Sequence, residues 1–116
     1  MKKDIRIYLD DVIESCTLIA KYIEGKNKQD FDKNEELQDA VIRRLEIIGE
    51  AIKRIPKDFR DKHPEIVWKK ATGMRDVLIH AYDEVETNQV WLTITEALPS
   101  FKQQIEQLLK IMELED

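Results

Sequence analysis

The feature that most constrains the fold is the spacing of apolar residues, which recur at intervals of three and four along most of the chain. The clearest run reads Ile5, Tyr8, Leu9, Val12, Ile13, Cys16, Ile19, Ala20 and Ile23. Such spacing gives an α-helix one apolar face. The chain has only three glycines and three prolines in 116 residues, and these provide few of the turns that an all-β fold needs. The sequence therefore predicts an all-α protein.

Two long helices are predicted in the first half of the chain. The first spans Asp4–Glu24, and Gly25 follows it where helices commonly end in a left-handed residue. The second begins at Asp32, with Glu35 as its capping-box partner, and ends before Pro56. A polar connection joins the two.

The second half of the chain predicts two more helices. After an irregular or single-turn segment at 57–64, the third helix spans Glu65–His80. An acidic turn at 83–87 precedes the last helix, Asn88–Leu114, whose apolar phase continues through Pro99. Proline removes a backbone donor, so the unbroken phase predicts a kink rather than a change of direction. The predicted architecture is an up-and-down bundle of four main helices, the last kinked at Pro99.

Length and composition also limit the number of domains and the cellular location of the protein. A chain of this length suits a single domain over residues 1–116. No apolar run approaches the roughly 20 residues of a membrane span, and the charged start lacks the apolar core of a secretory signal. We therefore expect a cytoplasmic protein without a membrane partner.

Cys16 is the chain's single cysteine, which excludes an internal disulfide and a thiolate metal cluster. It is predicted to pack as a small hydrophobe. No cofactor or metal is expected.

Charge is distributed unevenly along the chain. The net charge is −5, which argues against nonspecific coating of nucleic acid. Residues 41–80, however, carry ten basic against six acidic side chains, whereas the segments on either side are acidic. A solvated mixed surface would account for this pattern. The pattern also suits a phosphate-bearing substrate that reaches this one region.

One stretch, Gly73–Tyr82, places polar residues with chemical uses inside an apolar run. Asp76 and His80 are four residues apart, so on a helix their side chains can meet, and the carboxylate would fix the imidazole tautomer. Arg75 has a charged fork that matches a phosphate. Without a second metal-type ligand nearby, arginine plus histidine suits metal-independent cleavage of RNA, in which the substrate's 2′-hydroxyl is the nucleophile.

Helical geometry separates two of these residues. Arg75 and His80 are about 140° apart around an ideal helix, whereas Arg75 and Tyr82 differ by only about 20°. One regular helix therefore cannot aim Arg75 and His80 at the same small substrate. Either the helix unwinds near His80, or two copies of the chain build a joint site.

The second predicted helix favours the dimer. Ile42 and Ile47 lie outside its main apolar stripe and widen the apolar surface beyond what one neighbour needs. Gly49 costs about 1 kcal/mol relative to alanine inside a helix. This cost predicts that another helix approaches Gly49 closely.

Each candidate residue also has a structural interpretation. An arginine–aspartate–histidine group near a helix end is commonly a capping and salt-bridge cluster, and Tyr82 would then pack with its hydroxyl at the surface. His63 is interpreted as a loop or helix-start residue. Trp68 and Trp91 are predicted to be core or interface anchors rather than platforms on which bases stack.

The stretch Arg75–His80, with the sequence RDVLIH, resembles the signature of the HEPN superfamily: arginine, a polar residue, three variable residues and histidine. Its continuation to Tyr82 is similar to the narrower HepT family, ribonuclease toxins paired with MntA nucleotidyltransferase antitoxins. The similarity extends to residues 45–51, to Trp68 and to residues 90–99. It therefore covers nearly the whole chain.

The resemblance implies an HEPN-like homodimer whose cleft receives Arg75 and His80 from both protomers. It implies metal-independent endoribonuclease activity, with His80 in proton transfer, Arg75 at the scissile phosphate, and Asp76 orienting these residues. It also implies that an MntA-like nucleotidyltransferase attaches AMP to the hydroxyl of Tyr82 and so silences the toxin. The added bulk and negative charge would block and repel RNA.

Two other functions remain open from the sequence. The first is a non-catalytic helical partner, or substrate-binding subunit, of a nucleotidyltransferase. The second is a plain dimerisation module in which Arg75 and His80 are structural. Cleavage of RNA in EDTA by the wild type but not by His80→Ala separates the ribonuclease from both.

Overall fold

The computed structural model describes residues 4–68 and 84–115. These residues form the helices α1 (Ile5–Tyr22), α2 (Lys28–Lys33), α3 (Glu35–Arg54), α4 (Lys57–Asp61), α6 (Glu84–Leu92), η1 (Thr93–Ala97) and α7 (Leu98–Glu115). No strand occurs in this part of the chain, so the predicted all-α class is confirmed. None of the described helices is long and apolar enough to cross a membrane.

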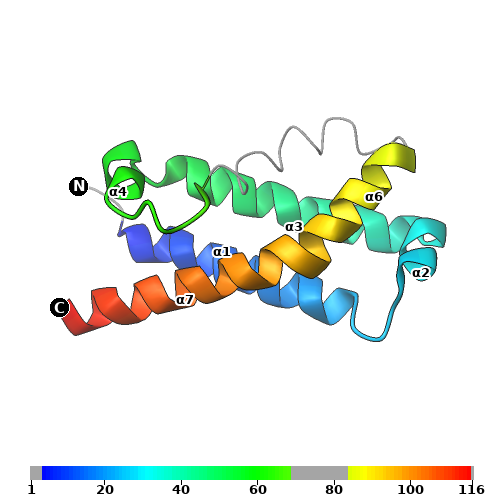
Figure 1. The fold of residues 1–116 in the computed structure, drawn as a ribbon, viewed down its shortest axis with the longest axis horizontal. Coiled ribbons are helices and arrows are strands. Elements are labelled where there is room, and N and C mark those ends of the chain that lie inside the picture. Colours follow the sequence, from blue (N-terminus) through cyan, green and yellow to red (C-terminus); the bar gives the residue numbers. More distant parts are fainter. Residues whose placement is uncertain (1–3, 69–83, 116) are drawn as a thin grey trace.

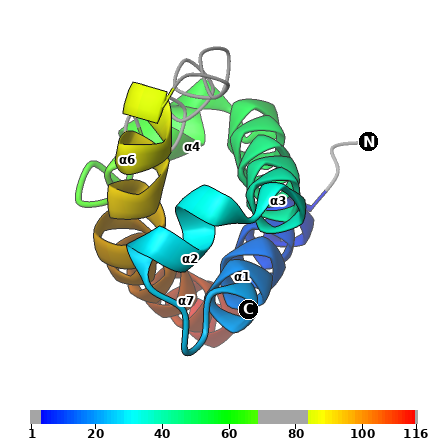
Figure 2. The same ribbon diagram turned by 90° about the vertical axis from the view of Figure 1, so that its right-hand side faces the viewer.

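Helix α1 lies between α3 and the rod formed by α6, η1 and α7 (Figures 1 and 2). Helix α3 and the rod run in the same direction, opposite to α1 (Figure 1). Helix α4 lies at one end of the bundle, and α2, which contacts α3 and α6, lies at the other. The predicted bundle is confirmed for these helices, and most of the predicted helix Glu65–His80 lies outside the described residues.

One hydrophobic core joins the described helices. Its fully buried members on α1, α3 and the rod are Leu9, Val12, Ile19, Val41, Leu45, Ile48, Ile52, Val90 and Ile105. Burial of each such side chain stabilises the fold by roughly 1.5–3 kcal/mol. Helix α2 adds Phe31, and Trp68 joins from the segment after α4. The buried positions on α1 and α3 keep the spacing of three and four that predicted these helices.

Both ends of α1 follow the prediction. Asp4 is the N-cap, and its carboxylate accepts a hydrogen bond from the Arg6 backbone N–H at 3.0 Å. At the other end the Ile23 N–H donates to the Ile19 carbonyl at 3.1 Å. Gly25 follows with a φ of +73°, the left-handed conformation that glycine adopts without steric cost.

The prediction of a single helix that begins at Asp32 is wrong. The chain forms two helices there, because two asparagines each cap a helix start. Asn27 accepts from the Asp30 N–H at 2.8 Å, and the Asp30 carboxylate accepts from the Asn27 N–H at 3.0 Å, which starts α2. Asn34 accepts from the Leu37 N–H at 3.1 Å and starts α3. The capping box therefore lies one short helix earlier than predicted.

No helix of the described chain approaches Gly49 closely, so the described residues of one protomer do not supply the neighbour predicted for it. A Cβ placed at Gly49 would meet no atom within 4 Å. Ile42 lies on the same flank of α3, where it is half-buried and packs against the core. Ile47 is also half-buried. Among the described residues, none lies within 4 Å of a Cβ at Gly49, so this position on α3 has no close neighbour there.

The described part of the last helix starts at Glu84 and continues through Pro99, so the acidic turn predicted at 83–87 is wrong for residues 84–87. Residues Thr93–Ala97 form a π-helical turn, in which the Leu98 N–H donates to the Thr93 carbonyl. Proline has no N–H, and its ring clashes with the carbonyl of the preceding turn. A π turn next to a proline accommodates this clash without ending the helix. The predicted continuous but kinked helix is confirmed (Figure 1).

Candidate functional site

The predicted site residues Arg75, Asp76, His80 and Tyr82 all fall within residues 69–83, outside the described part of the chain. The structure does describe the two segments that lead into and out of this stretch. These come from different ends of the bundle, the first from the α4 end and the second from the α2 end (Figure 1).

The leading segment, residues 60–68, is anchored by Trp68. The indole N–H lies 3.1 Å from the Arg60 carbonyl and 3.0 Å from the His63 carbonyl, so one donor serves two acceptors. The Trp68 side chain is buried, and its ring meets Phe101 of α7 edge-on, with the centroids 6.4 Å apart and an interplanar angle of 82°. Trp68 is therefore a core anchor, as predicted, and it holds the chain directly before the undescribed stretch.

Polar contacts hold the rest of the leading segment. His63 Nδ1 lies 3.3 Å from Glu65 Oε1, and the His63 ring packs on Phe59 with the centroids 4.7 Å apart. Gln104 of α7 donates to the Glu65 carbonyl at 3.3 Å. Helical structure does not begin before Trp68, so the helix start predicted near Glu65 is wrong. Local turns use the carbonyls that would begin a helix there.

The trailing segment, residues 84–98, is held mainly by packing. Trp91 is half-buried, and its ring lies 5.4 Å from the Phe31 ring of α2, tilted by 39°. The Thr95 hydroxyl donates to the Trp91 carbonyl at 2.7 Å, within the helix. Trp91 is therefore a packing anchor, as predicted, rather than an open platform for a base.

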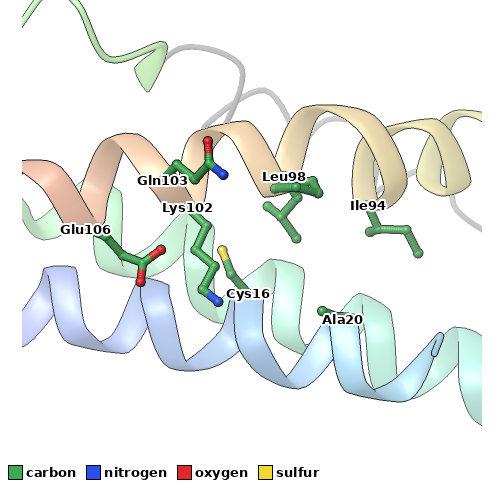
Figure 3. Close-up of a pocket in the computed structure, with 8 residues that line it drawn as sticks. Cys16, Ala20, Ile94, Leu98, Lys102, Gln103 and Glu106 are labelled. Carbon is green, nitrogen blue, oxygen red and sulfur yellow. The ribbon is translucent and has the colours of Figure 1, made fainter.

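A cavity of about 230 Å³ lies between α1 and the η1–α7 part of the rod (Figure 3). Ile94 and Leu98 line it, Cys16 directs its thiol toward α7, and Lys102 and Glu106 extend toward α1. Burial raises the pKa of the Cys16 thiol to about 12, despite the opposing effect of the Lys102 ammonium. The thiol is therefore protonated at neutral pH and unsuited to be a nucleophile. This agrees with the packing role predicted for Cys16.

The described basic side chains of residues 41–80 lie on α3, on α4 and just after it. The exposed ones are Arg43, Lys53, Arg54, Lys57 and Lys62. Arg43 pairs with Glu46 at 3.5 Å, and Lys57 pairs with Asp61 at 3.1 Å. Outside residues 1–3, 69–83 and 116, no three histidine, cysteine, aspartate or glutamate side chains converge to form a metal site.

Comparison with known proteins gives one family. The chain matches the model of the family described as ribonuclease HepT-like over residues 12–108. A protein of Methanocaldococcus jannaschii named "Gamma-glutamylcyclotransferase and putative RNase" is 47% identical over 113 residues, 97% of this chain. The chain spans only 50% of that relative's length. The "Probable ribonuclease HepT" of Thermococcus cleftensis is 46% identical over 110 residues, 95% of this chain and 100% of that protein. No solved structure matches the chain.

Proposed function

Because the chain belongs to the ribonuclease HepT-like family, we propose that it is a metal-independent endoribonuclease, the toxin of a toxin–antitoxin pair in the cytoplasm. The observation that carries the proposal is the family match, whose span includes Arg75, Asp76, His80 and Tyr82. The leading and trailing segments are consistent with a site in the stretch between them, because both segments are anchored on the bundle. The chain would act as a single HEPN-like domain.

In the proposed reaction the 2′-hydroxyl of the RNA attacks the adjacent phosphorus. The O2′–P bond forms and the P–O5′ bond breaks, so the products are a 2′,3′-cyclic phosphate and a 5′-hydroxyl. His80 accepts the proton that leaves O2′, or donates the proton that arrives at O5′. Arg75 binds the phosphate oxygens and stabilises the charge that develops on them. Asp76 orients the imidazole.

The test of this chemistry compares the chain's two histidines. The wild type is expected to cleave RNA in EDTA, and His80→Ala is expected to lower the rate by roughly 10²–10⁴-fold. His63→Ala is the matched control, because His63 lies outside the signature stretch: its ring meets Phe59 and its Nδ1 lies 3.3 Å from Glu65 Oε1. At saturating RNA it is expected to cleave within about twofold of the wild type. Equal cleavage by His80→Ala and the wild type would remove His80 from the mechanism.

If the wild type cleaves no RNA, the alternative function is tested next. If the wild type forms a stable complex with an MntA-like nucleotidyltransferase but cleaves no RNA, the chain is the non-catalytic partner instead. Expression of the chain alone would then leave cell growth unchanged.

The proposed site lies between two protomers, because Arg75 and His80 point about 140° apart on one regular helix. The flank of α3 at Gly49 supports a dimer, since nothing in the described chain approaches a Cβ at Gly49 within 4 Å. No described residue would therefore hinder a second copy from packing closely there. This contact would offset the roughly 1 kcal/mol that glycine costs inside a helix.

Gly49→Leu tests this interface. A Cβ at Gly49 meets no described atom within 4 Å, and leucine improves helix propensity, so the chain is expected to fold, become monomeric and lose cleavage. Glu50→Leu is the control, because Glu50 is exposed and lies about 100° away around the helix. It is expected to remain dimeric and active. Sedimentation of Gly49→Leu as an active dimer would place the interface elsewhere.

Regulation is proposed at Tyr82. Its hydroxyl would attack the α-phosphorus of ATP bound by an MntA-like nucleotidyltransferase, forming an O–P bond to AMP and releasing pyrophosphate. Bulk and negative charge beside a phosphate-binding site would block and repel RNA. Intact-protein mass after incubation with the transferase is expected to show one added AMP in the wild type and in Tyr22→Phe, but none in Tyr82→Phe. Modification of Tyr82→Phe would contradict the assignment.

A further inference from the structure

A second cavity lies at the α4 end of the bundle and is called the end cavity. Its volume is about 580 Å³, and its walls come from the start of α1, the end of α3, α4 and the last turns of α7. Cavities of roughly 300–1,000 Å³ are typical of small-molecule and cofactor sites. The end cavity is therefore large enough for a ligand the size of one nucleotide.

Apolar and aromatic side chains form part of its wall. Tyr8, Phe59 and Met112 line the end cavity, and each is half-buried, so part of each side chain remains accessible. The Phe59 ring packs on His63 with the centroids 4.7 Å apart, which helps to fix its orientation. Aromatic side chains held in this way can stack on a base, and such stacking tolerates any base because every base has a π-face.

Two cationic side chains line the same cavity as these rings. Arg54 and Lys62 line the end cavity, are exposed, and form no ion pair with another described residue. By contrast, Lys57 in the same region pairs with Asp61 at 3.1 Å. An arginine fork and a lysine ammonium are the side chains that bind phosphate groups in proteins.

A carboxylate completes the set. Asp58 and Asp4 both line the cavity; Asp4 pairs with Arg6 at 2.7 Å, whereas Asp58 makes no ion pair within the described chain. Carboxylates accept hydrogen bonds from sugar hydroxyls and from amino groups of bases. The carboxylate of a fatty acid could pair with the cations, and its alkyl chain could contact the apolar wall. Asp58 would then face either the alkyl chain or another negative charge, and both are unfavourable. A ligand with an aromatic ring, hydroxyl groups and a phosphate uses all three kinds of side chain.

We infer that the end cavity binds one nucleotide unit, with the base against Phe59 and Tyr8, the phosphate on Arg54 and Lys62, and a hydroxyl or amino group on Asp58. The inference deepens the proposed function and rests on it in one respect: the nucleotide would belong to the RNA substrate, bound outside the cleavage site. A free mononucleotide has the same chemistry. The experiment therefore includes both sources.

Charge-matched double variants test the cations. In a His80→Ala background, which keeps the RNA intact, Arg54→Gln/Lys62→Gln is expected to weaken binding of a fluorescent single-stranded RNA 12-mer by about tenfold. Lys53→Gln/Lys57→Gln removes the same charge from positions that do not line the cavity. It is expected to change the Kd by less than about twofold. Equal weakening by the two double variants would show general charge attraction and would overturn the inference.

The Met112 methyl group reports on the cavity directly. Its ¹H–¹³C signal, assigned with Met112→Leu, is expected to shift when the 12-mer is added. A matching shift with 5′-AMP, together with competition, would identify free nucleotide as a source; a shift with the 12-mer alone would identify the RNA. Both results support a nucleotide site. A Met112 signal that neither probe moves would overturn it.

Cleavage by the His80-intact chain, measured in parallel, separates this inference from the proposed function. If the His80-intact chain cleaves RNA while Met112 stays unmoved, the end cavity is not a nucleotide site and the ribonuclease proposal stands. If Met112 shifts with 5′-AMP but the His80-intact chain cleaves no RNA, the nucleotide site stands and the ribonuclease proposal fails.

Discussion

The leading and trailing segments border the same signature stretch but are held by different interactions. Trp68 in the leading segment is buried and gives its N–H to two carbonyls. Trp91 in the trailing segment is half-buried and rests on Phe31, beside a π turn. A tryptophan anchored by hydrogen bonds fixes both position and orientation, whereas one anchored by packing depends on its neighbour. The same residue type therefore has two different roles, and substitutions can separate them.

The largest expected effect is on the packing of the trailing segment. Phe31 is 1% exposed and is the buried side chain that α2 contributes to the core. Phe31→Ala is expected to lower the free energy of unfolding by about 3–5 kcal/mol, because it leaves a cavity under Trp91. Urea denaturation measures this loss. A loss below about 1 kcal/mol would mean that other contacts hold the trailing segment.

The two tryptophans provide the second prediction. Trp68→Phe is expected to cost about 2 kcal/mol, because it removes a donor shared by two carbonyls and some buried surface. The Arg60 and His63 carbonyls each keep one backbone partner, which limits the loss. Trp91→Phe keeps a ring on Phe31 and is expected to cost less than about 1 kcal/mol. If urea denaturation shows that both variants lose the same free energy of unfolding, the two tryptophans do not differ in how they anchor their segments.

A smaller effect is expected at the π turn. Thr95→Val removes the hydroxyl that donates to the Trp91 carbonyl at 2.7 Å, and is expected to cost about 0.5–1 kcal/mol. Thr17→Val is the matched control, because its hydroxyl makes the same contact with the Ile13 carbonyl at 2.8 Å in the exposed, regular part of α1. It is expected to cost almost nothing. If both variants lose the same stability, the π turn does not depend on its threonine.

The smallest effect at neutral pH concerns Cys16, beside the cavity next to the π turn. Its thiol pKa is about 12 in the folded chain against an ordinary value of 9.0. Between these values the unfolded chain loses the proton first, so the stability of the wild type relative to Cys16→Ala falls as the pH rises above about 9 and is unchanged below it. Urea denaturation from pH 7 to pH 10.5 measures this slope. Parallel curves for the two proteins would contradict the buried, protonated thiol.

The helices that the sequence predicts best are those whose boundaries depend on local chemistry. The periodic stripe and Gly25 locate α1 to within two residues at its C-terminal end. The break at Asn34 is harder to predict, because Asn27 and Asn34 both suit an N-cap and Phe31 lies off the stripe that begins at Leu37. The π turn depends on how the helix absorbs Pro99, which periodicity does not encode.

For the candidate site, the sequence predicts which residues act together but not where a second copy of the chain would bind. Residue spacing identifies Arg75, Asp76 and His80 as a chemical group and excludes their convergence on one straight helix. The spacing cannot say which surface a second copy would cover. Gly49 illustrates this, because its cost predicts a close neighbour and the described part of the protomer supplies none. A partner on this flank is an intermolecular property, and single-chain periodicity does not specify it.

The central claim, RNA cleavage through the 2′-hydroxyl, is tested most directly by the products. An RNA oligonucleotide is incubated with the wild-type chain in EDTA, and its new ends are identified by mass spectrometry. The predicted result is a 2′,3′-cyclic phosphate and a 5′-hydroxyl, both lost when the nucleotide before the cut is 2′-deoxy or when His80 is alanine. Continued cleavage of the 2′-deoxy substrate at the same position would contradict the account.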